Sequence, residues 1–154
     1  MRVRKLLLIV PLLLAFPLQA QELRVAELGE CALESGAVLA PCDVSYRTYG
    51  ELNANRDNAI LISTWFGGNS AAWTGILGGG LIDLEGFYTI VVDAFGNGVS
   101  TSPTNSPTQG GDAFPLVSIG DMVQAQHRLV TEVQGLDGLY AVMGISMGGM
   151  QTFE

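Results

Sequence analysis

A serine between two glycines is the strongest chemical signal in this sequence of 154 residues. Ser146 is the centre of a G-x-S-x-G pattern, residues 144–148, which directly follows an apolar run at residues 139–143. A serine hydroxyl becomes an effective nucleophile when neighbouring groups expose and activate it. Gly144 and Gly148 permit the necessary tight turn, because no side chain fits where a strand reverses into a helix. We therefore expect a nucleophile elbow, with an ordinary glycine-rich turn as the alternative.

The same geometry predicts where the negative charge on an attacked carbonyl would be stabilised. The backbone amide of Met147, which follows the serine, would point into the site as one donor of an oxyanion hole. The second donor normally comes from the turn after an earlier buried strand. Residues 59–63 are a continuous apolar run, and the turn at residues 64–68 follows them. Phe66 is the predicted second donor, and a plain apolar turn is the alternative.

The remaining titratable candidates receive no catalytic role. His127 is the only histidine and precedes Ser146 in the chain. On such a scaffold the order is serine, acid and then histidine, so we expect His127 to be an exposed surface residue. Asp93 begins the pattern D-x-x-G-x-G-x-S after a second apolar run, at residues 88–92. We interpret that pattern as a turn.

The elements that must position these residues alternate between buried strands and helices. The stretch 22–49 is strand-like with breaks at Gly29, Gly36 and Pro41, and its last part alternates as a half-exposed strand does. Three apolar runs, at residues 59–63, 88–92 and 139–143, are typical of buried parallel strands. Residues 50–58 read as a loop, and residues 98–115 as a long loop that is either functional or mobile. The pattern predicts an α/β fold with a parallel sheet and right-handed crossovers.

One helix is clearly signalled between the second and third of these strands. Ser118 is a good N-cap, Asp121 can complete a capping box, and Gly135 can end the helix. Its mostly apolar face comprises Ile119, Met122, Val123, Gln126, Leu129, Val130 and Val133. The polar side comprises Gln124, His127, Arg128 and Thr131.

Residues 1–20 have the pattern of a secretory signal peptide, with cleavage after Ala20. Three basic residues precede an apolar run that is short for a membrane span of about 20 residues, although an uncleaved anchor is the alternative. We expect export to the periplasm or outside the cell. Cleavage leaves four arginines, no lysine and fifteen acidic residues, a net charge of −11. So acidic a chain disfavours nucleic-acid partners, and a phosphate loop would lack its lysine.

Cys31 and Cys42 are the only cysteines, and export would bring them into an oxidising space. We expect them to form a disulfide, with two free buried thiols as the alternative. A single histidine and two cysteines without metal-ligand spacing make a metal site improbable. We expect no cofactor and no stable membrane span after cleavage, and the sequence does not indicate an oligomeric state.

Several segments together resemble a known family. They are residues 46–53 (YRTYGELN), residues 57–60 (DNAI), Asp121-Met-Val, Ala125-Gln126 and residues 144–151 (GISMGGMQ). Over residues 44–154 the chain resembles the homoserine O-acetyltransferase (MetX-like) branch of the α/β-hydrolases. The resemblance implies an α/β-hydrolase fold with a mostly parallel sheet and flanking helices. It also implies acyl transfer from a small ester or acyl donor through an acyl-enzyme on Ser146, with the Phe66 and Met147 amides as the oxyanion hole.

The chain also departs from that branch. Residues 64–68 replace a His-Ala-Leu-Thr-Gly-like turn, and Gly120 stands where the biosynthetic enzymes tend to have arginine. Acetyl-CoA and homoserine are cytosolic, so export would separate the enzyme from its donor. These departures favour a MetX-like esterase. A homoserine O-acetyltransferase using acetyl-CoA is the alternative, and a non-catalytic exported product is an alternative of another class.

The resemblance implies that residues 21–154 are the N-terminal part of a longer α/β-hydrolase domain. Only eight residues follow Ser146. The acid and the histidine of a Ser…Asp…His order therefore cannot lie in this chain. We expect the full-length protein to be an enzyme and the chain of 154 residues to lack efficient serine catalysis, because its general base is missing.

Overall fold

A mixed five-stranded sheet carries the fold in the computed structural model, which describes residues 22–78 and 84–154. Its spatial order is β1 (Arg24–Glu27), β4 (Asp43–Tyr49), β6 (Tyr88–Val92), β5 (Ala59–Ser63) and β7 (Ala141–Gly144). β4 pairs antiparallel with both β1 and β6, whereas β5 pairs in parallel with β6 and β7. The predicted signal peptide, residues 1–20, lies outside the described residues.

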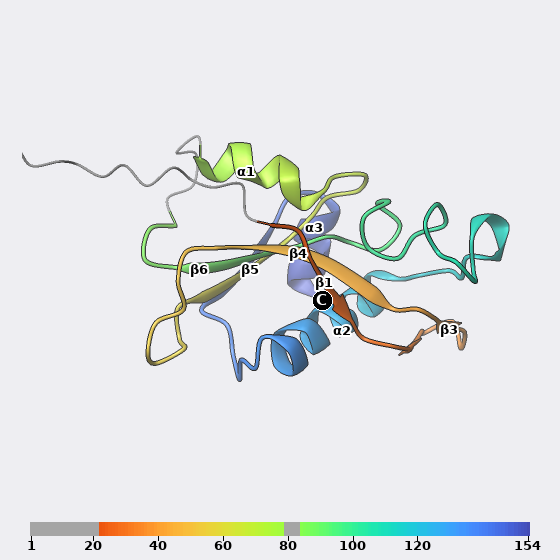
Figure 1. The fold of residues 1–154 in the computed structure, drawn as a ribbon, viewed down its shortest axis with the longest axis horizontal. Helices are drawn as coiled ribbons and strands as arrows, with labels where there is room; N and C mark the ends of the chain where they lie inside the picture. The colour runs from red at the N-terminus through yellow and green to blue at the C-terminus, as the bar shows by residue number, and fades with distance from the viewer. Residues whose placement is uncertain (1–21, 79–83) are drawn as a thin grey trace, which may run out of the picture.

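Helices cover both faces of this sheet (Figure 1). α1 (Ser70–Gly78) covers one face, and α2 (Ile119–Arg128) and α3 (Met147–Phe153) lie on the other. Alternate residues of β5 enter two cores. Leu61 packs in the cluster that includes α2, and Ile62 packs with Trp73 of α1. β5 is therefore buried on both faces, as a continuous apolar run predicts.

The strand predictions for the centre of the sheet are confirmed. β5 and β6 have the predicted bounds. The strand-like stretch 22–49 divides into β1, the short β2 (Cys31–Ala32) and β3 (Val38–Leu39), and β4. The breaks fall at Gly29 and Gly36, which have φ of 74° and 82°, and at Pro41, which follows a cis peptide bond. Among the described residues, no helix is long and apolar enough to cross a membrane.

β4 is not half-exposed, so that prediction is wrong. Ser45 and Thr48, on its two sides, are both buried. The reason is the long loop at residues 98–115, which folds over the strand. The Ser45 amide donates to Ser100 Oγ at 2.9 Å, and the Ser45 hydroxyl donates to the Val99 carbonyl at 3.0 Å. The loop at residues 98–115, rather than solvent, therefore covers the side of β4 that carries Ser45.

β7 also differs from its prediction. It runs from Ala141 to Gly144 instead of residues 139–143, and it is only partly buried, with Val142 38% exposed. Within the part of the chain that the structure describes, β7 lies at the edge of the sheet and pairs only with β5. An apolar run shows that a strand can be buried. Whether it is buried depends on how many strands and helices pack against it.

The capped helix begins as predicted. Ser118 is the N-cap, and Asp121 completes a reciprocal capping box. The α-helix ends at Arg128, and a turn of π-helix, η2 (Leu129–Val133), follows before Gly135 at φ 62°. Val133 is 44% exposed, so its place on the apolar face is wrong, because the wider π-turn shifts the helical period.

Helix α1 is absent from the sequence-based expectations. It contains two glycines and no charged residue. Neither helix propensity nor a polar face marks it as a helix. Burial of Trp73, only 1% exposed, against the sheet gives α1 its place in the fold.

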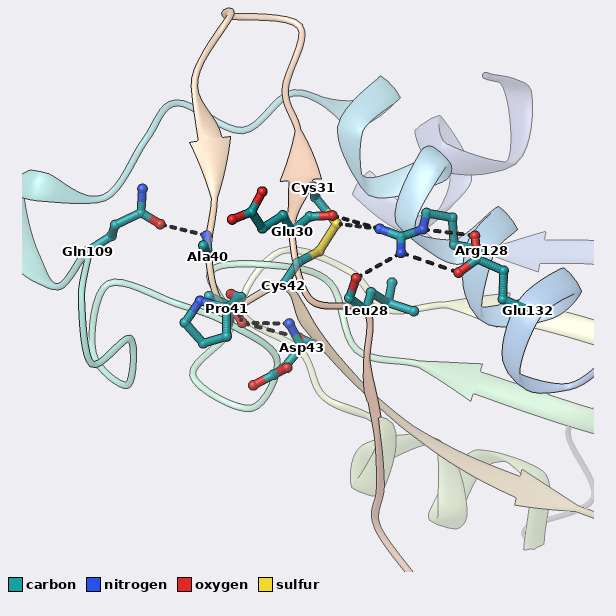
Figure 2. Close-up of a disulfide and its surroundings, with 11 residues drawn as sticks. Leu28, Glu30, Cys31, Ala40, Pro41, Cys42, Asp43, Gln109, Arg128 and Glu132 are labelled. Carbon is teal, nitrogen blue, oxygen red and sulfur yellow. Dashed lines mark hydrogen bonds and ion pairs between the residues drawn. A yellow bond between two sulfur atoms is a disulfide. The ribbon is translucent and has the colours of Figure 1, made fainter.

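Cys31 and Cys42 are joined by a disulfide that closes the β2–β3 hairpin (Figure 2). Arg128, at the end of α2, contacts the same hairpin. Its guanidinium donates to the carbonyls of Leu28 at 2.8 Å and Glu30 at 2.9 Å, and it pairs with Glu132 at 3.0 Å. The disulfide closes the hairpin, and Arg128 attaches the residues that lead into the hairpin to the end of α2.

Replacing both cysteines by serine is expected to lower the free energy of unfolding by about 2–3 kcal/mol. The cysteines are 11 residues apart in sequence, and opening this loop gives chain entropy back to the unfolded state. Urea denaturation of the oxidised protein, the reduced protein and the double variant measures the change. Equal midpoints for all three would contradict the expectation.

Candidate active site

The strand-to-helix turn at Ser146 has the strained backbone expected of a nucleophile elbow. β7 ends at Gly144, α3 begins at Met147, and Ser146 between them has φ 57° and ψ −121°. Positive φ is rare for residues other than glycine and costs roughly 1–3 kcal/mol. The turn is closed by the Gly148 amide, which donates to the Ile145 carbonyl at 3.0 Å. The Ser146 residue itself is exposed.

The two flanking glycines are required by contacts between backbones. A Cβ added at Gly144 would lie 2.1 Å from the Gly148 carbonyl group. A Cβ added at Gly148 would lie 2.3 Å from the carbonyl oxygen of Ser63, the last residue of β5. The start of α3 is therefore pressed against the end of β5. This contact brings the elbow beside the turn that follows β5.

That turn is the one predicted to supply the second oxyanion donor. The Gly68 amide donates to the Trp65 carbonyl at 2.9 Å, and Gly67 has φ 71°. This hydrogen bond does not use the Phe66 amide. The Phe66 side chain is 83% exposed, so the residue is not placed there by core packing. The roles of the Phe66 and Met147 amides stay predictions.

Trp65 folds back over its own turn. A Cβ added at Gly68 would lie 2.4 Å from the Trp65 ring, so only glycine fits beneath the indole. The Trp65 ring also packs on Trp73 of α1, with ring centroids 5.9 Å apart. The side chain thus connects the turn to the helix that follows it.

Asp93 anchors the same turn from the β6 side. Its carboxylate accepts hydrogen bonds from the Ser70 amide and hydroxyl, both at 2.7 Å, and from Asn97 Nδ2 at 3.0 Å. Asn97 Nδ2 also donates to the Gly68 carbonyl at 3.0 Å. Burial raises the pKa of the Asp93 carboxyl, although the hydrogen bonds from Ser70 and Asn97 act to lower it. Asp93 therefore has a structural role at the site that the turn interpretation missed.

A second polar network lies behind the elbow. It comprises Ser63, Gln126 of α2, Gln151 of α3 and the carbonyl of Thr64, and all four residues are buried. The helical spacing alone places Gln126 on the predicted, mostly apolar face of the helix. A glutamine among apolar residues on a core-facing stripe is the signal that could have revealed this network, because a buried amide requires partners.

His127 is exposed on α2, which confirms its expected surface position. Among residues 22–78 and 84–154, no group of three or more histidine, cysteine, aspartate or glutamate side chains is arranged to hold a metal ion. The described residues thus place the turn after β5, which contains Phe66, next to the start of α3, which contains Met147. They do not bring a histidine to Ser146.

Gly148→Ala is expected to destabilise the protein by at least about 2 kcal/mol, because the added methyl group meets a backbone carbonyl that cannot rotate away. Gly149→Ala is the matched control. Its Cβ would lie no closer than 3.5 Å to Gly144, so it should be neutral or stabilising. Thermal denaturation of both variants measures the difference. Equal melting temperatures would show that the Gly148 contact is not a constraint.

Asp93→Asn is expected to remove a pH-dependent part of the stability. Because its pKa is raised by burial, folded Asp93 keeps its proton to a higher pH than unfolded Asp93. Its contribution to the free energy of folding therefore becomes less favourable as pH rises from the ordinary pKa through the raised one. The stability advantage of wild type over Asp93→Asn should be largest at low pH, fall across this window and then level off.

Urea denaturation between about pH 3 and pH 7 measures that difference. Asp112→Asn, which changes an exposed carboxylate on η1 (Gly111–Ala113), is the control. A pH-independent difference between wild type and Asp93→Asn would contradict the expectation.

Sequence comparison finds both hydrolases and acyltransferases among the relatives. The chain is 42% identical over 130 residues to an ethyl acetate hydrolase of Pseudomonas veronii, covering 82% of this chain and 37% of the relative. It is 39% identical over 144 residues to a homoserine O-acetyltransferase of Geotalea uraniireducens, covering 81% of this chain and 39% of the relative. The chain thus spans well under half the length of these relatives. No protein-family profile matches it.

Solved structures that resemble the chain also include both an esterase and a homoserine O-acetyltransferase. The acetyl esterase MekB matches with a TM-score of 0.81 and 38% identity over 87% of this chain and 40% of that structure. Homoserine O-acetyltransferase from Staphylococcus aureus matches with a TM-score of 0.70 and 26% identity, over 85% of this chain and 41% of that structure. The homologues of this chain are therefore esterases and homoserine O-acetyltransferases of the MetX-like type, and its structural neighbours are α/β-hydrolases.

Proposed function

We propose that the protein containing this chain is an exported serine esterase that hydrolyses small acyl esters. The observation that carries the proposal is the strained backbone of Ser146, at φ 57° and ψ −121°, on an exposed turn. Strain of this kind persists only where the surrounding structure enforces it, and it concentrates at active sites. Here the close contacts of Gly148 with Ser63 and of Gly144 with Gly148 enforce it.

In the proposed reaction, the Ser146 hydroxyl oxygen attacks the ester carbonyl and its proton passes to a general base. The amides of Phe66 and Met147 stabilise the resulting oxyanion. The alcohol leaves with the proton, and the acyl group stays on Ser146 as an ester. Water then attacks this acyl-enzyme, releases the carboxylic acid and restores the serine hydroxyl. The general base and its acid partner are proposed to come from parts of the protein outside these 154 residues.

The choice of small esters is supported by the relatives and by the turn. The hydrolase relative acts, by its name, on ethyl acetate, and the structural match to an acetyl esterase has the higher identity and TM-score of the two structures compared. The exposed Phe66 side chain, on the turn that follows β5, offers apolar surface to a short acyl or alkyl group.

Homoserine acetylation is the second candidate, supported by relatives of nearly equal identity. Two observations weigh against it. Gly120 stands where the biosynthetic enzymes resembled here tend to have arginine, and the Glu34 carboxylate occupies the adjacent space, 2.6 Å from where a Cβ would lie. Residues 21–154 also contain no lysine, and a net charge of −11 disfavours a polyanionic donor such as acetyl-CoA.

Export is proposed from the signal-peptide pattern of residues 1–20, and the Cys31–Cys42 disulfide supports it. Disulfides persist in oxidising compartments and are rare in the cytosol. Hydrolysis of a small neutral ester outside the cytoplasm would require neither a cofactor nor an activated acyl donor.

Ser146→Ala is expected to abolish hydrolysis of p-nitrophenyl acetate by the full-length protein, with a fall in kcat of roughly 10³-fold or more. Release of p-nitrophenol measures the rate. The exposed Ser35→Ala is the matched control and should retain full activity. Acetyl, butyryl and octanoyl esters compared in the same assay define the acyl length accepted.

The same preparation should be incubated with acetyl-CoA and homoserine. We expect no CoA release above background. Homoserine-dependent CoA release would overturn the esterase proposal in favour of the acetyltransferase. Absence of both activities would contradict the enzyme proposal itself.

A further inference from the structure

Two segments must keep a fixed relation if Phe66 and Met147 are to bind one oxyanion. Phe66 follows β5, and Met147 begins α3, so the two amides belong to different elements. Oxyanion donors act because they are held in position before charge develops, and small displacements lose much of the effect. The backbone contact of Gly148 with Ser63 limits how closely the segments approach. It does not by itself set their orientation.

A single side-chain amide bonds to both segments. Gln151 Nε2 donates to the Thr64 carbonyl at 3.3 Å and to the Met147 carbonyl at 3.2 Å. Thr64 lies two residues before Phe66, and Met147 carries the other proposed donor. Gln151 is one turn beyond Met147 on α3 and is 4% exposed, so solvent does not compete for these bonds.

Gln151 is itself held by a second amide. Gln126 Nε2 of α2 donates to Gln151 Oε1, and Gln126 Oε1 accepts from the Ser63 hydroxyl at 2.9 Å. These hydrogen bonds orient both amides, because each oxygen accepts and each nitrogen donates. The network therefore ties the end of β5, α2 and α3 into one unit directly behind the elbow.

The rest of the turn is fixed independently on its other side. The Thr64 amide donates to the Val92 carbonyl at 3.2 Å, and Thr64 Oγ1 accepts from the Ala94 amide at 3.0 Å. These bonds tie the turn to β6 but not to the elbow. Among the hydrogen bonds of the described residues, the bond from Gln151 to Thr64 is the polar link between this turn and α3.

We propose that Gln151, oriented by Gln126, is a positioning residue that holds the Phe66 turn in register with the elbow. The proposal rests on the esterase function proposed above and extends it to two residues that do not touch the substrate. A buried amide costs free energy unless its bonds are made, and apolar side chains could fill the same space. The side-chain amides of Gln126 and Gln151 orient the oxyanion donors through hydrogen bonds. Two apolar side chains in the same positions could not do so.

The test compares Gln151→Met with a matched control in the full-length protein. Methionine fills similar volume and cannot make the amide hydrogen bonds. The control is Asn58→Leu. Asn58 is also a buried amide, donating to the carbonyls of Glu51 at 3.0 Å and Gly86 at 2.8 Å, but it directly precedes β5, at the opposite end of that strand from Ser63. Both variants should lose stability, and only Gln151→Met should disturb the site.

For Gln151→Met, kcat for p-nitrophenyl acetate should fall about 10- to 100-fold while KM changes less than about twofold, because the loss is confined to the transition state. Affinity for a phenylboronic acid, which forms a tetrahedral anion on the serine, should fall in the same proportion as kcat/KM. Asn58→Leu should leave kcat, KM and boronate affinity within about twofold of wild type at a temperature where it is folded.

Hydrogen–deuterium exchange provides a readout that needs no activity. Amides in residues 64–69 should exchange at least about tenfold faster in Gln151→Met than in Asn58→Leu. If wild type hydrolyses no ester, the function proposal fails, and this exchange comparison still decides the positioning role. Unchanged exchange at residues 64–69, or an unchanged kcat in a folded and active protein, would overturn the inference.

Ser63→Ala serves if Gln151→Met does not fold. It removes only the hydroxyl that donates to Gln126 and creates little cavity. A fall in kcat of about three- to tenfold with unchanged KM supports the role. A kcat equal to wild type, together with wild-type exchange at residues 64–69, contradicts it.

Discussion

Contact between the backbone of Gly148 and the carbonyl of Ser63 is the constraint on which the candidate site depends. A Cβ at Gly148 would lie 2.3 Å from that oxygen, so only glycine lets α3 start against the end of β5. The same approach forces Ser146 into its positive-φ conformation, because the chain must leave β7 and enter α3 within two residues. The strain at the serine and the proximity of the Phe66 turn are thus two results of one close packing.

Close packing sets a distance, and buried polar groups set an orientation. Asp93 fixes the start of α1 through Ser70, and Gln151 fixes the Thr64 carbonyl from the side of the elbow. Such groups are costly to bury and require complete hydrogen bonding, so they favour one arrangement of the turn over many similar ones. The arrangement follows the α/β-hydrolase fold of the homologues, in which the catalytic loops lie at the carboxyl ends of the parallel strands.

Features determined within a few residues were predictable from sequence. Examples are the bounds of β5, the Ser118–Asp121 capping box and the strand-to-helix turn at Ser146. Features that depend on distant partners were not. Burial of β4 depends on Ser100, 55 residues away, and the Gln126–Gln151 pair spans 25 residues. The helical periodicity predicts that Gln126 faces the core. The structure is needed to identify Gln151 as its hydrogen-bond partner there.

Helix α2 lies between the chain around the Cys31–Cys42 disulfide and the Gln151 side chain of α3, and it contacts both. At its start, the Glu34 amide donates to Asp121 Oδ1 at 2.8 Å, and at its end Arg128 donates to the carbonyls of Leu28 and Glu30. Glu34 lies within the loop closed by the Cys31–Cys42 disulfide, and Leu28 and Glu30 directly precede that loop. Gln126 lies between these two attachments, so the hairpin fixes the helix that orients Gln151. The chain beside the disulfide therefore contacts both ends of the helix that carries Gln126.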